Sequence, residues 1–295
     1  MYAIGLCLDE NYLLPGLVTI MSVAHSTSAR DRKSIAIRVI TNDLTKPHGD
    51  AIAAFSRALG FGSFDLEWRG LHERYRVVDG AYITATTYLR FDFSPGFVQR
   101  PHLIYLDCDL LVLDDISSPF NTVGATQLGV VRDEFNYTVG ECPALPGYVD
   151  RFPAFHGRPY FNAGALWLGT NLMPTIKNGV AGVLAGRKRR HIFFNDQDAM
   201  NIWLIERGRV AQLASHLNRF EIGRFIELGD DYWVRMNALT KPRPASVLHF
   251  IGELKPWLKR CPTTPGVRCY RLQLGEARRL LCKLRIQTIC VQDDQ

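Results

Sequence analysis

Two aspartates interrupt an otherwise apolar run, "YLDCDLLVL", at residues 105–113. A lone buried carboxylate costs several kcal/mol or takes up a proton, and in an extended chain Asp107 and Asp109 point the same way. Capping of the next segment, or pairing with Arg or Lys, would explain a generic pair of this kind. Mg²⁺ and Mn²⁺, however, prefer oxygen ligands, commonly one or two carboxylates with phosphate oxygens and water. At the end of a core strand, the two aspartates therefore predict a divalent cation site.

A second acidic cluster, "FNDQDAMN", lies at residues 194–201. Asp196 and Asp198 open an expected helix, where negative charge is favoured and where Asn195 or Asp196 can cap the helix. Gln197 lies between them, and its amide both donates and accepts hydrogen bonds. The pattern fits helix capping alone, or contact with a polyhydroxylated substrate.

A third cluster, "HFIGELKPW", lies at residues 249–257. His249 ends a strand-like run, so it can lie at the same sheet edge as Asp109 and serve as a third ligand for Mn²⁺. A hydrogen-bonded core histidine is the ordinary alternative. Gly252 permits close backbone approach, and Lys255 offers a point charge for phosphate. The segment therefore resembles a diphosphate pocket, although neither a Walker A nor a G-x-G-x-x-G pattern occurs in the chain.

The exit of the first expected strand reads "CLDENY", residues 7–12. Asp9, Asn11 and Tyr12 are able to hydrogen-bond to a nucleotide base and stack on it. The alternative is a helix cap formed by Asp9 or Asn11.

Strand and helix signals alternate along the first half of the chain, which predicts a parallel sheet with right-handed crossovers. Ligands of such sheets bind at the carboxyl ends of the strands, where the two aspartates are expected. The expected strands cover residues 2–8, 35–41, 63–68, 102–106, 160–169 and 246–250. The expected helices cover residues 13–24, 50–60, 82–93, 171–184, 196–207 and, as a basic amphipathic helix, 276–289.

The composition is that of a globular protein of 295 residues, 47% of them hydrophobic. This length fits an α/β domain of about 200 to 250 residues with an appendage. The net charge is +6, and residues 252–295 contain nine Lys or Arg against four Asp or Glu. The excess points to anionic partners such as phosphates or an acidic membrane surface. It is not accompanied by a zinc-finger or RNP-type pattern, so nucleic acid is not expected.

The seven cysteines form no C-x-x-C pair, which excludes zinc-ribbon spacing. We expect a reducing compartment, with a disulfide among the last four cysteines as the alternative. The N-terminus lacks the pattern of a signal peptide, and no apolar stretch reaches the roughly 20 residues needed to cross a bilayer. A cytoplasmic protein is therefore expected. Its basic helix at 276–289 would either bind the inner face of an anionic membrane or pack back on the domain.

In chain order, six segments together resemble glycosyltransferase family 8 over roughly residues 3–258: "DENY", "TATTYLR", "YLDCDLLV", "YFNAGALWL", "NDQD" and "HFIGELKPW". The family includes bacterial lipopolysaccharide galactosyl- and glucosyltransferases and glycogenin. The resemblance implies a GT-A fold, a single Rossmann-like nucleotide-binding α/β domain with a mixed central sheet. We assign residues 1–258 to this catalytic domain and residues 259–295 to a short basic C-terminal segment, expected to be helical.

The resemblance also implies the reaction: metal-dependent, retaining transfer of a hexose, galactose or glucose, from a UDP-sugar to a hydroxyl of a glycan, lipid-linked or small-molecule acceptor. It implies Mn²⁺ or Mg²⁺ as the cofactor, with Asp107, Asp109 and His249 as its ligands. The donor contacts that it implies are Cys7, Asp9, Asn11 and Tyr12 for uridine, Arg90, Asn162 and Ala163 near the donor sugar, and Gly252 and Lys255 for the diphosphate. Asp196 and Gln197 are the implied catalytic residues, at the sugar hydroxyls and next to the anomeric carbon.

Three features depart from the family pattern. Cys108, within the D-x-D, stands where Thr, Ala or Ser is commoner, and its side chain should point away from the metal. Trp167 is bulkier than usual, and residues 134–157 match nothing in the family, which leaves the acceptor open. Alternative functions are a UDP-sugar- or glycan-binding homologue without transfer activity and a natural-product glycosyltransferase. A phosphotransferase with Asp107 as nucleophile fits less well, because in haloacid-dehalogenase-type enzymes that motif lies on the first strand.

Overall fold

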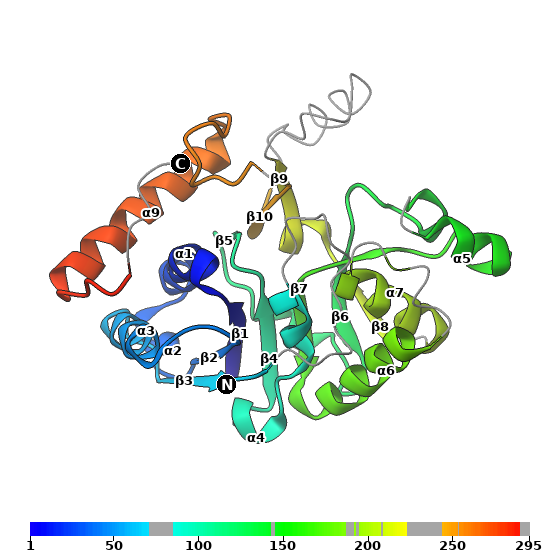
Figure 1. The fold of residues 1–295 in the computed structure, drawn as a ribbon, viewed down its shortest axis with the longest axis horizontal. Coiled ribbons are helices and arrows are strands. Elements are labelled where there is room, and N and C mark those ends of the chain that lie inside the picture. Colours follow the sequence, from blue (N-terminus) through cyan, green and yellow to red (C-terminus); the bar gives the residue numbers. More distant parts are fainter. Residues whose placement is uncertain are drawn as a thin grey trace.

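The computed structural model describes residues 1–70, 85–142, 145–186, 192, 195–207, 209–222, 244–252 and 254–289. In this part of the chain, two sheets carry the fold (Figure 1). The larger sheet has the order β3-β2-β1-β4-β7-β6-β8, and the smaller has the order β5-β10-β9. The strands are β1 (Tyr2–Leu8), β2 (Ala36–Thr41), β3 (Ser63–Trp68), β4 (His102–Leu106), β5 (Leu110–Val112), β6 (Leu128–Arg132), β7 (Phe161–Gly169), β8 (Val210–Leu213), β9 (Arg219–Ile222) and β10 (Val247–Ile251).

Helices connect the strands and cover both faces of the larger sheet. The α-helices are α1 (Leu13–His25), α2 (Ala29–Arg32), α3 (Lys46–Ala58), α4 (Pro95–Val98), α5 (Pro146–Arg151), α6 (Met173–Ala185), α7 (Asn195–Arg207) and α9 (Pro265–Lys283). The 3₁₀ turns are η1 (Glu10–Tyr12), η2 (Ala85–Phe91), η3 (Ser118–Asn121), η4 (Val139–Glu141), η5 (Pro153–Phe155), η6 (Thr170–Leu172) and η8 (Ser215–Asn218). In the described residues, no helix is both long and apolar enough to span a membrane.

The first three strands confirm the predicted βαβαβ order. β1 pairs in parallel with β2, and β2 with β3, with α1 and α3 as crossovers. All of β1 is buried, and its side chains alternate between two cores. Ile4 and Leu6 face the core shared with α1 and α3, whereas Ala3 and Cys7 face the core shared with α6 and α7. A strand buried on both faces reads as a continuous apolar run, which explains why "YAIGLCL" was recognisable.

β1 also pairs in parallel with β4, so the segments that follow these two strands leave the sheet at the same edge. β7 runs antiparallel to both β4 and β6, which makes the sheet mixed, as the resemblance implies. Because β7 runs the other way, its first residues lie at the edge where β4 ends. The backbone N–H of Asp107 donates to the carbonyl oxygen of Gly164 at 2.8 Å. Sheet topology therefore places "YLDCDLLVL" against "YFNAGALWL".

Trp167, the bulky departure from the family pattern, is fully buried. Its Nε1–H donates to the carbonyl oxygen of Ile116 at 2.8 Å, so the indole satisfies its polar atom inside the core. Gly129 lies opposite it on β6. A Cβ at Gly129 would lie 3.0 Å from Trp167 Cβ and 2.8 Å from Val123 Cγ2. The glycine thus provides the space that the large side chain needs.

The C-terminal helix differs from its prediction. α9 begins at Pro265 and ends at Lys283, rather than covering 276–289. Thr264 caps its N-terminus by accepting a hydrogen bond from the Val267 N–H, and proline at the first turn suits a helix start. Arg285, two residues after the last helical residue, has a left-handed φ of 56°, so the helix cannot continue past it. Thr264 and Pro265 therefore mark the start of the helix.

α9 packs back on the domain. Its inner stripe is buried in the core that contains α1, and the two helices lie side by side in Figure 1. The stripe consists of Val267, Tyr270, Leu274, Ala277 and Leu281. The face that an amphipathic helix would insert into a membrane is thus covered by protein.

Two further segments refine the predictions. The helix expected at 82–93 is a 3₁₀ helix over 85–91, and residues 82–84 lie outside the described residues. The segment 134–157 contains η4, α5 and η5. It is anchored at its start because Glu134 forms an ion pair of 2.9 Å with Arg219 and accepts the Phe220 N–H on β9. The short strands β5, β6, β8 and β9 were not predicted.

Candidate active site

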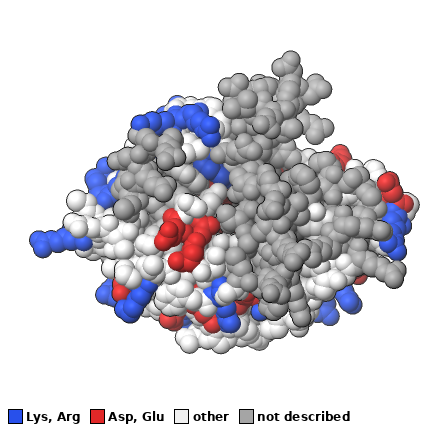
Figure 2. Space-filling model, in the orientation of Figure 1, with Lys and Arg blue, Asp and Glu red and all other residues white. Residues whose placement is uncertain are grey.

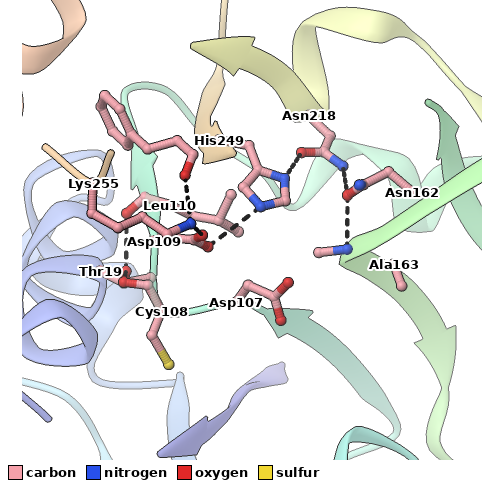
Figure 3. Close-up of polar contacts among 12 residues, drawn as sticks. Thr19, Asp107, Cys108, Asp109, Leu110, Asn162, Ala163, Asn218, His249 and Lys255 are labelled. Atoms are coloured by element: carbon pink, nitrogen blue, oxygen red, sulfur yellow. Dashed lines mark hydrogen bonds and ion pairs between the residues drawn. The ribbon is translucent and has the colours of Figure 1, made fainter. Parts of the chain in front are cut away.

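The D-x-D turn between β4 and β5 is held by two buried hydroxyls of α1. Thr19 Oγ1 lies 3.1 Å from the carbonyl oxygen of Cys108 and 2.9 Å from that of Leu110 (Figure 3). Ser22 Oγ accepts the N–H of Val112 at 2.9 Å. Backbone groups that leave the larger sheet at this turn thereby find partners inside the core. The helix thus fixes the backbone that carries both aspartates.

Cys108 points away from the two carboxylates, as expected. Figure 3 shows its side chain directed away from Asp107 and Asp109. Its Sγ contacts the carbonyl oxygen of Cys7, at the end of β1, at 3.0 Å. Burial raises the pKa of the Cys108 thiol, and the charges of Asp107 and Asp109 raise it further. The side chain is therefore a neutral thiol that links the D-x-D turn to the first strand.

Asp107, Asp109 and His249 converge as the sequence predicted. Each offers a ligand atom, and these atoms all lie within 4.8 Å of one another. His249 Nε2 lies 3.3 Å from Asp109 Oδ1. The histidine arrives from β10, which pairs antiparallel with β5 and places His249 opposite Leu110. Two carboxylates and one imidazole suit Mn²⁺, so the donor set fits the divalent cation that the resemblance implies.

Lys255 supplies a positive charge beside the same carboxylate. Its buried Nζ lies 2.6 Å from Asp109 Oδ2 and 2.9 Å from the carbonyl oxygen of Phe250. Gly252, with a left-handed φ of 87°, lies in the turn that brings the chain back from β10 to Lys255. Burial alone would raise the pKa of Asp109, but Lys255 and His249 outweigh it and hold that pKa well below its usual range. Asp109 is therefore a carboxylate.

Arg90 joins the D-x-D to the second acidic cluster. It is only 4% exposed, and its guanidinium lies 3.2 Å from Asp107 Oδ1 and 2.8 Å from Asp196 Oδ2. It also donates to the carbonyl oxygen of Ala163 at 2.5 Å. Burial would lower the pKa of Arg90, but the two carboxylates outweigh it and raise that pKa. Burial also raises the pKa of Asp196, against the attraction of Arg90. The arginine thus stays charged between two acidic groups that lie far apart in sequence.

The residues of "NDQD" face different partners. Asp198 is fully buried and accepts a hydrogen bond of 2.5 Å from the Tyr160 hydroxyl, so its role is structural. Gln197 Oε1 accepts hydrogen bonds from Asn162 Nδ2 and from the Ala163 N–H, each at 3.0 Å. Asp196 Oδ2, by contrast, accepts no hydrogen bond from the described residues, although it pairs with Arg90. Asp196 is therefore held in place by its ion pair with Arg90.

The expected uridine segment lies at the end of β1. Asp9 caps η1 by accepting the Tyr12 N–H at 2.9 Å, which is the capping alternative considered for it. Tyr12 packs edge-to-face against Trp257, with ring centroids 5.7 Å apart. Burial raises the pKa of Tyr12, and the charge of Asp109 adds to the rise. Asn11 is exposed. Nucleotide contact by these residues stays a prediction.

Two residues at the site were not predicted. Asp133 is buried at the end of β6, and its Oδ2 lies 3.4 Å from Gln197 Nε2. Burial raises the pKa of Asp133 against hydrogen bonds from two backbone N–H groups. Its position after the apolar strand "LGVV" follows the same pattern as Asp107 and could have been noticed. Asn218 contacts His249 Nδ1 at 3.0 Å, and nothing in its surrounding sequence signals this role.

Residues 3–261 match the sequence profile of glycosyl transferase family 8, so the chain belongs to this family. Curated relatives include a probable glycosyl transferase, Gly, of Streptococcus gordonii, 28% identical over 187 residues that make up 59% of this chain and 22% of the relative. The glycosyltransferase GlyF of Streptococcus pneumoniae serotype 4 is 20% identical over 86% of this chain and 57% of its own length. The chain thus spans about a fifth to three fifths of the length of these two relatives.

Solved structures share the fold. A galactosyltransferase, LgtC, in complex with donor and acceptor sugar analogues, matches with a TM-score of 0.71 and 23% identity, over 93% of this chain and 95% of that one. The glycosyltransferase GlyE of Streptococcus pneumoniae matches with a TM-score of 0.62 and 17% identity, over 98% of this chain and 64% of that one. These likenesses establish the GT-A fold that the sequence resemblance implies.

Gly164 allows His249 to reach the two aspartates. A Cβ at Gly164 would lie 2.3 Å from His249 Cε1, a distance at which the ring must move. We expect Gly164→Ala to weaken Mn²⁺ binding at least about tenfold in calorimetry and to cost about 1–3 kcal/mol of stability through overpacking. Gly169→Ala, at the other end of β7, is the matched control, because its Cβ would meet only Ala125 at 3.5 Å. Equal Mn²⁺ affinity in both variants would contradict this role of Gly164.

Proposed function

We propose that this chain is a retaining, metal-dependent hexosyltransferase. It would move galactose or glucose from a UDP-sugar to a hydroxyl of a glycan, lipid-linked or small-molecule acceptor. The observation that carries the proposal is the convergence of Asp107, Asp109 and His249 on one point, with Lys255 beside them. The fold shared with LgtC, a galactosyltransferase bound to donor and acceptor sugar analogues, supports this choice of substrates.

Asp107, Asp109 and His249 would hold Mn²⁺ or Mg²⁺, which supplies positive charge to a diphosphate leaving group when bound. Lys255 would turn from Asp109 toward the diphosphate and add a second positive charge, beside the backbone of Gly252. The uridine would lie at the end of β1, against Cys7, Asp9, Asn11 and Tyr12. The three segments involved, at the ends of β1, β4 and β10, lie close to the D-x-D turn, at the edge where ligands of α/β sheets bind.

Asp196 and Gln197 would contact the donor sugar, with Asn162 and Ala163 lining that side of the site. A carboxylate can accept several hydrogen bonds, which suits sugar hydroxyls, and Arg90 holds the carboxylate of Asp196 in place. Gln197 Oε1 already accepts two hydrogen bonds, and an amide is a poor nucleophile. These contacts favour positioning over covalent catalysis.

Retention of configuration would follow from attack on the same face that the diphosphate leaves. The bond from the anomeric carbon to the UDP oxygen breaks as the bond to the acceptor oxygen forms, through an oxocarbenium-like transition state of the kind known in glycoside chemistry. The acceptor hydroxyl gives its proton to the departing phosphate oxygen. A sugar trapped covalently on Asp133, Asp196 or Gln197 would overturn this route.

Asp109→Asn tests the metal assignment. The variant should lose Mn²⁺-dependent UDP binding in calorimetry, because one charged ligand is gone. The amide removes the negative charge 2.6 Å from Lys255, so a lower melting temperature is expected, and circular dichroism must show that the variant is folded. Asp65→Asn is the matched control, since it removes a carboxylate 3.9 Å from the buried Arg38 on a distant strand. Unchanged UDP affinity in folded Asp109→Asn would refute the assignment.

Asp196→Ala tests the sugar contact. We expect its rate of UDP release from UDP-galactose or UDP-glucose to fall at least about a hundredfold, because a buried acceptor for sugar hydroxyls is lost. Its affinity for UDP itself should stay within a fewfold of wild type, since Asp196 would not touch the nucleotide. Comparable losses in both measurements would contradict the assignment. If the wild-type protein binds UDP but releases none from any UDP-sugar, the binding-only alternative would replace the proposed function.

We further propose that the protein contacts an anionic membrane from the cytoplasmic side through charge rather than insertion. Lys and Arg side chains lie along the upper left margin of the face in Figure 2, where Figure 1 places α9. Arg268, Arg279 and Lys283 are exposed on α9, together with Leu272, which is 69% exposed. Each basic residue near an acidic surface contributes about 1 kcal/mol. This contact would place the active site close to a lipid-linked acceptor.

A double variant, Arg279→Glu with Lys283→Glu, tests this contact without removing the packed stripe of α9. Sedimentation with vesicles that contain phosphatidylserine should fall at least about tenfold, and added salt should weaken wild-type binding in the same way. The matched control is Arg30→Glu with Arg57→Glu, which reverses two exposed charges on α2 and α3. Equal sedimentation of all three proteins would rule out docking through α9.

A further inference from the structure

The imidazole of His249 is held on three sides. Phe220 packs edge-to-face against it, with ring centroids 5.6 Å apart. Gly164 leaves the space that the ring occupies. Asn218, fully buried at the end of η8, lies with its Oδ1 3.0 Å from His249 Nδ1. The first two contacts position the ring by shape, whereas Asn218 at Nδ1 and Asp109 at Nε2 give its two nitrogens different partners.

The orientation of the neighbouring amides follows from a backbone group. The N–H of Gly164 contacts Asn162 at 2.8 Å. A backbone N–H can only donate, so the atom that faces it is the oxygen, Oδ1. The same Oδ1 lies 2.8 Å from Asn218, which must therefore present its Nδ2 to Asn162. The oxygen of Asn218 is then left facing His249 (Figure 3).

An amide oxygen can only accept, so His249 Nδ1 must carry a proton to bond with Asn218. In the neutral ring, the lone pair then belongs to Nε2. This is the nitrogen that lies 3.3 Å from Asp109 Oδ1 and faces the candidate metal position. Partners of this kind on the second nitrogen commonly fix the tautomer of a metal-binding histidine.

The other end of Asn162 is anchored in the same way. Its Nδ2 donates to Gln197 Oε1 at 3.0 Å, and the orientation of that amide is set by the Ala163 N–H. Three consecutive residues, 162 to 164, thus supply one side chain and two backbone donors to a single chain of hydrogen bonds. This series of hydrogen bonds runs from His249 through Asn218 and Asn162 to Gln197.

We propose that Asn162 and Asn218 are positioning residues that hold His249 in the Nδ1–H tautomer and so keep Nε2 available as a metal ligand. The proposal rests on the proposed function for the presence of a metal, but the tautomer can be measured without one. It gives Asn162 a role beyond the predicted sugar contact, since both of its polar side-chain atoms are already bonded within the protein.

The tautomer is tested first by nuclear magnetic resonance on metal-free protein labelled with ¹⁵N-histidine, at a pH where the ring is neutral. His249 is assigned among the eight histidines by the signal that disappears in His249→Gln. The wild-type ring should carry its proton on Nδ1. In Asn218→Leu, the proton should move to Nε2 or exchange between the two nitrogens. A wild-type ring protonated on Nε2 would overturn the proposal, whether or not the protein binds metal.

The second test is Mn²⁺ affinity, measured by calorimetry. Asn218→Leu should bind Mn²⁺ about 10- to 100-fold more weakly, which is the usual loss when the partner of a metal-binding histidine is removed. Asn218→Asp keeps an oxygen toward Nδ1 but loses the donor to Asn162 Oδ1, so it should recover part of that loss, with the proton still on Nδ1. Unchanged affinity in folded Asn218→Leu would overturn the proposal.

Asn201→Leu is the matched control. Asn201 is equally buried, but its hydrogen bonds go to Phe161 and to the carbonyl oxygen of Gln197 rather than to His249. It should lower the melting temperature and leave the His249 tautomer unchanged. If Asn201→Leu lost as much Mn²⁺ affinity as Asn218→Leu, a general loss of stability would explain the effect, and the hydrogen bond from His249 to Asn218 would not. If wild-type protein binds no Mn²⁺, the metal assignment fails, and the resonance measurement still decides the tautomer.

Discussion

The structure depends on the neutralisation of carboxylates placed together at the end of a core strand. Asp107 and Asp109 carry ligand atoms within 4.8 Å of each other. At an effective dielectric constant of 20, two like charges at this distance repel by roughly 3 kcal/mol. Each aspartate is therefore held beside a cation from elsewhere, Arg90 for Asp107 and Lys255 for Asp109. Because both cations are buried, removing the carboxylate beside either of them would strongly destabilise the domain.

This constraint explains the architecture around the site. Lys255 reaches Asp109 only because β10 adds to β5, which lies just after the D-x-D turn. Arg90 reaches Asp107 and Asp196 because the sheet brings β4 and β7 together. The hydroxyls of Thr19 and Ser22 then replace the hydrogen bonds that the turn gives up on leaving the sheet. Segments from five regions of the chain must come together before each buried charge has its partner. The site therefore forms only in the folded domain.

The ion pairs and hydrogen bonds of the site connect two groups of residues that would contact different parts of the substrate. The cluster around Asp109 and His249 faces the predicted diphosphate, whereas Asp196 and Gln197 face the predicted sugar. Arg90 joins the two sides by ion pairs, and Asn162 with Asn218 joins them by amide hydrogen bonds. A site of this kind holds most of its charged and polar groups in place before the substrate arrives, with Lys255 as the group that would turn. The choice of acceptor would then be left to the segment 134–157, which is anchored to β9 through Glu134.

The sequence alone predicted the family, the elements of the first half and the three side chains, Asp107, Asp109 and His249, that converge in the structure. Strands such as β1 and β7 can be recognised from the sequence because burial on both faces requires a continuous apolar run. The aspartates can be recognised because carboxylates are rare in such runs. Short strands such as β5 and β9 carry no such signal, since three or four residues are stabilised mainly by their neighbours in the sheet. α9 begins 11 residues before the expected residue 276, because Thr264 caps its N-terminus and Pro265 suits its first turn.

Only the tertiary structure decided how the charges and amides are paired. Nothing near Asn218 in the sequence indicates that it contacts His249, and nothing near Arg90 indicates that it joins Asp107 to Asp196. Pairing of this kind depends on which strands become neighbours, and residue types and spacing carry little information about that. The sequence by itself therefore determined which residues bring charge to the site. The fold decided which charge offsets which, because opposite charges and hydrogen-bond partners meet only after distant strands have come together.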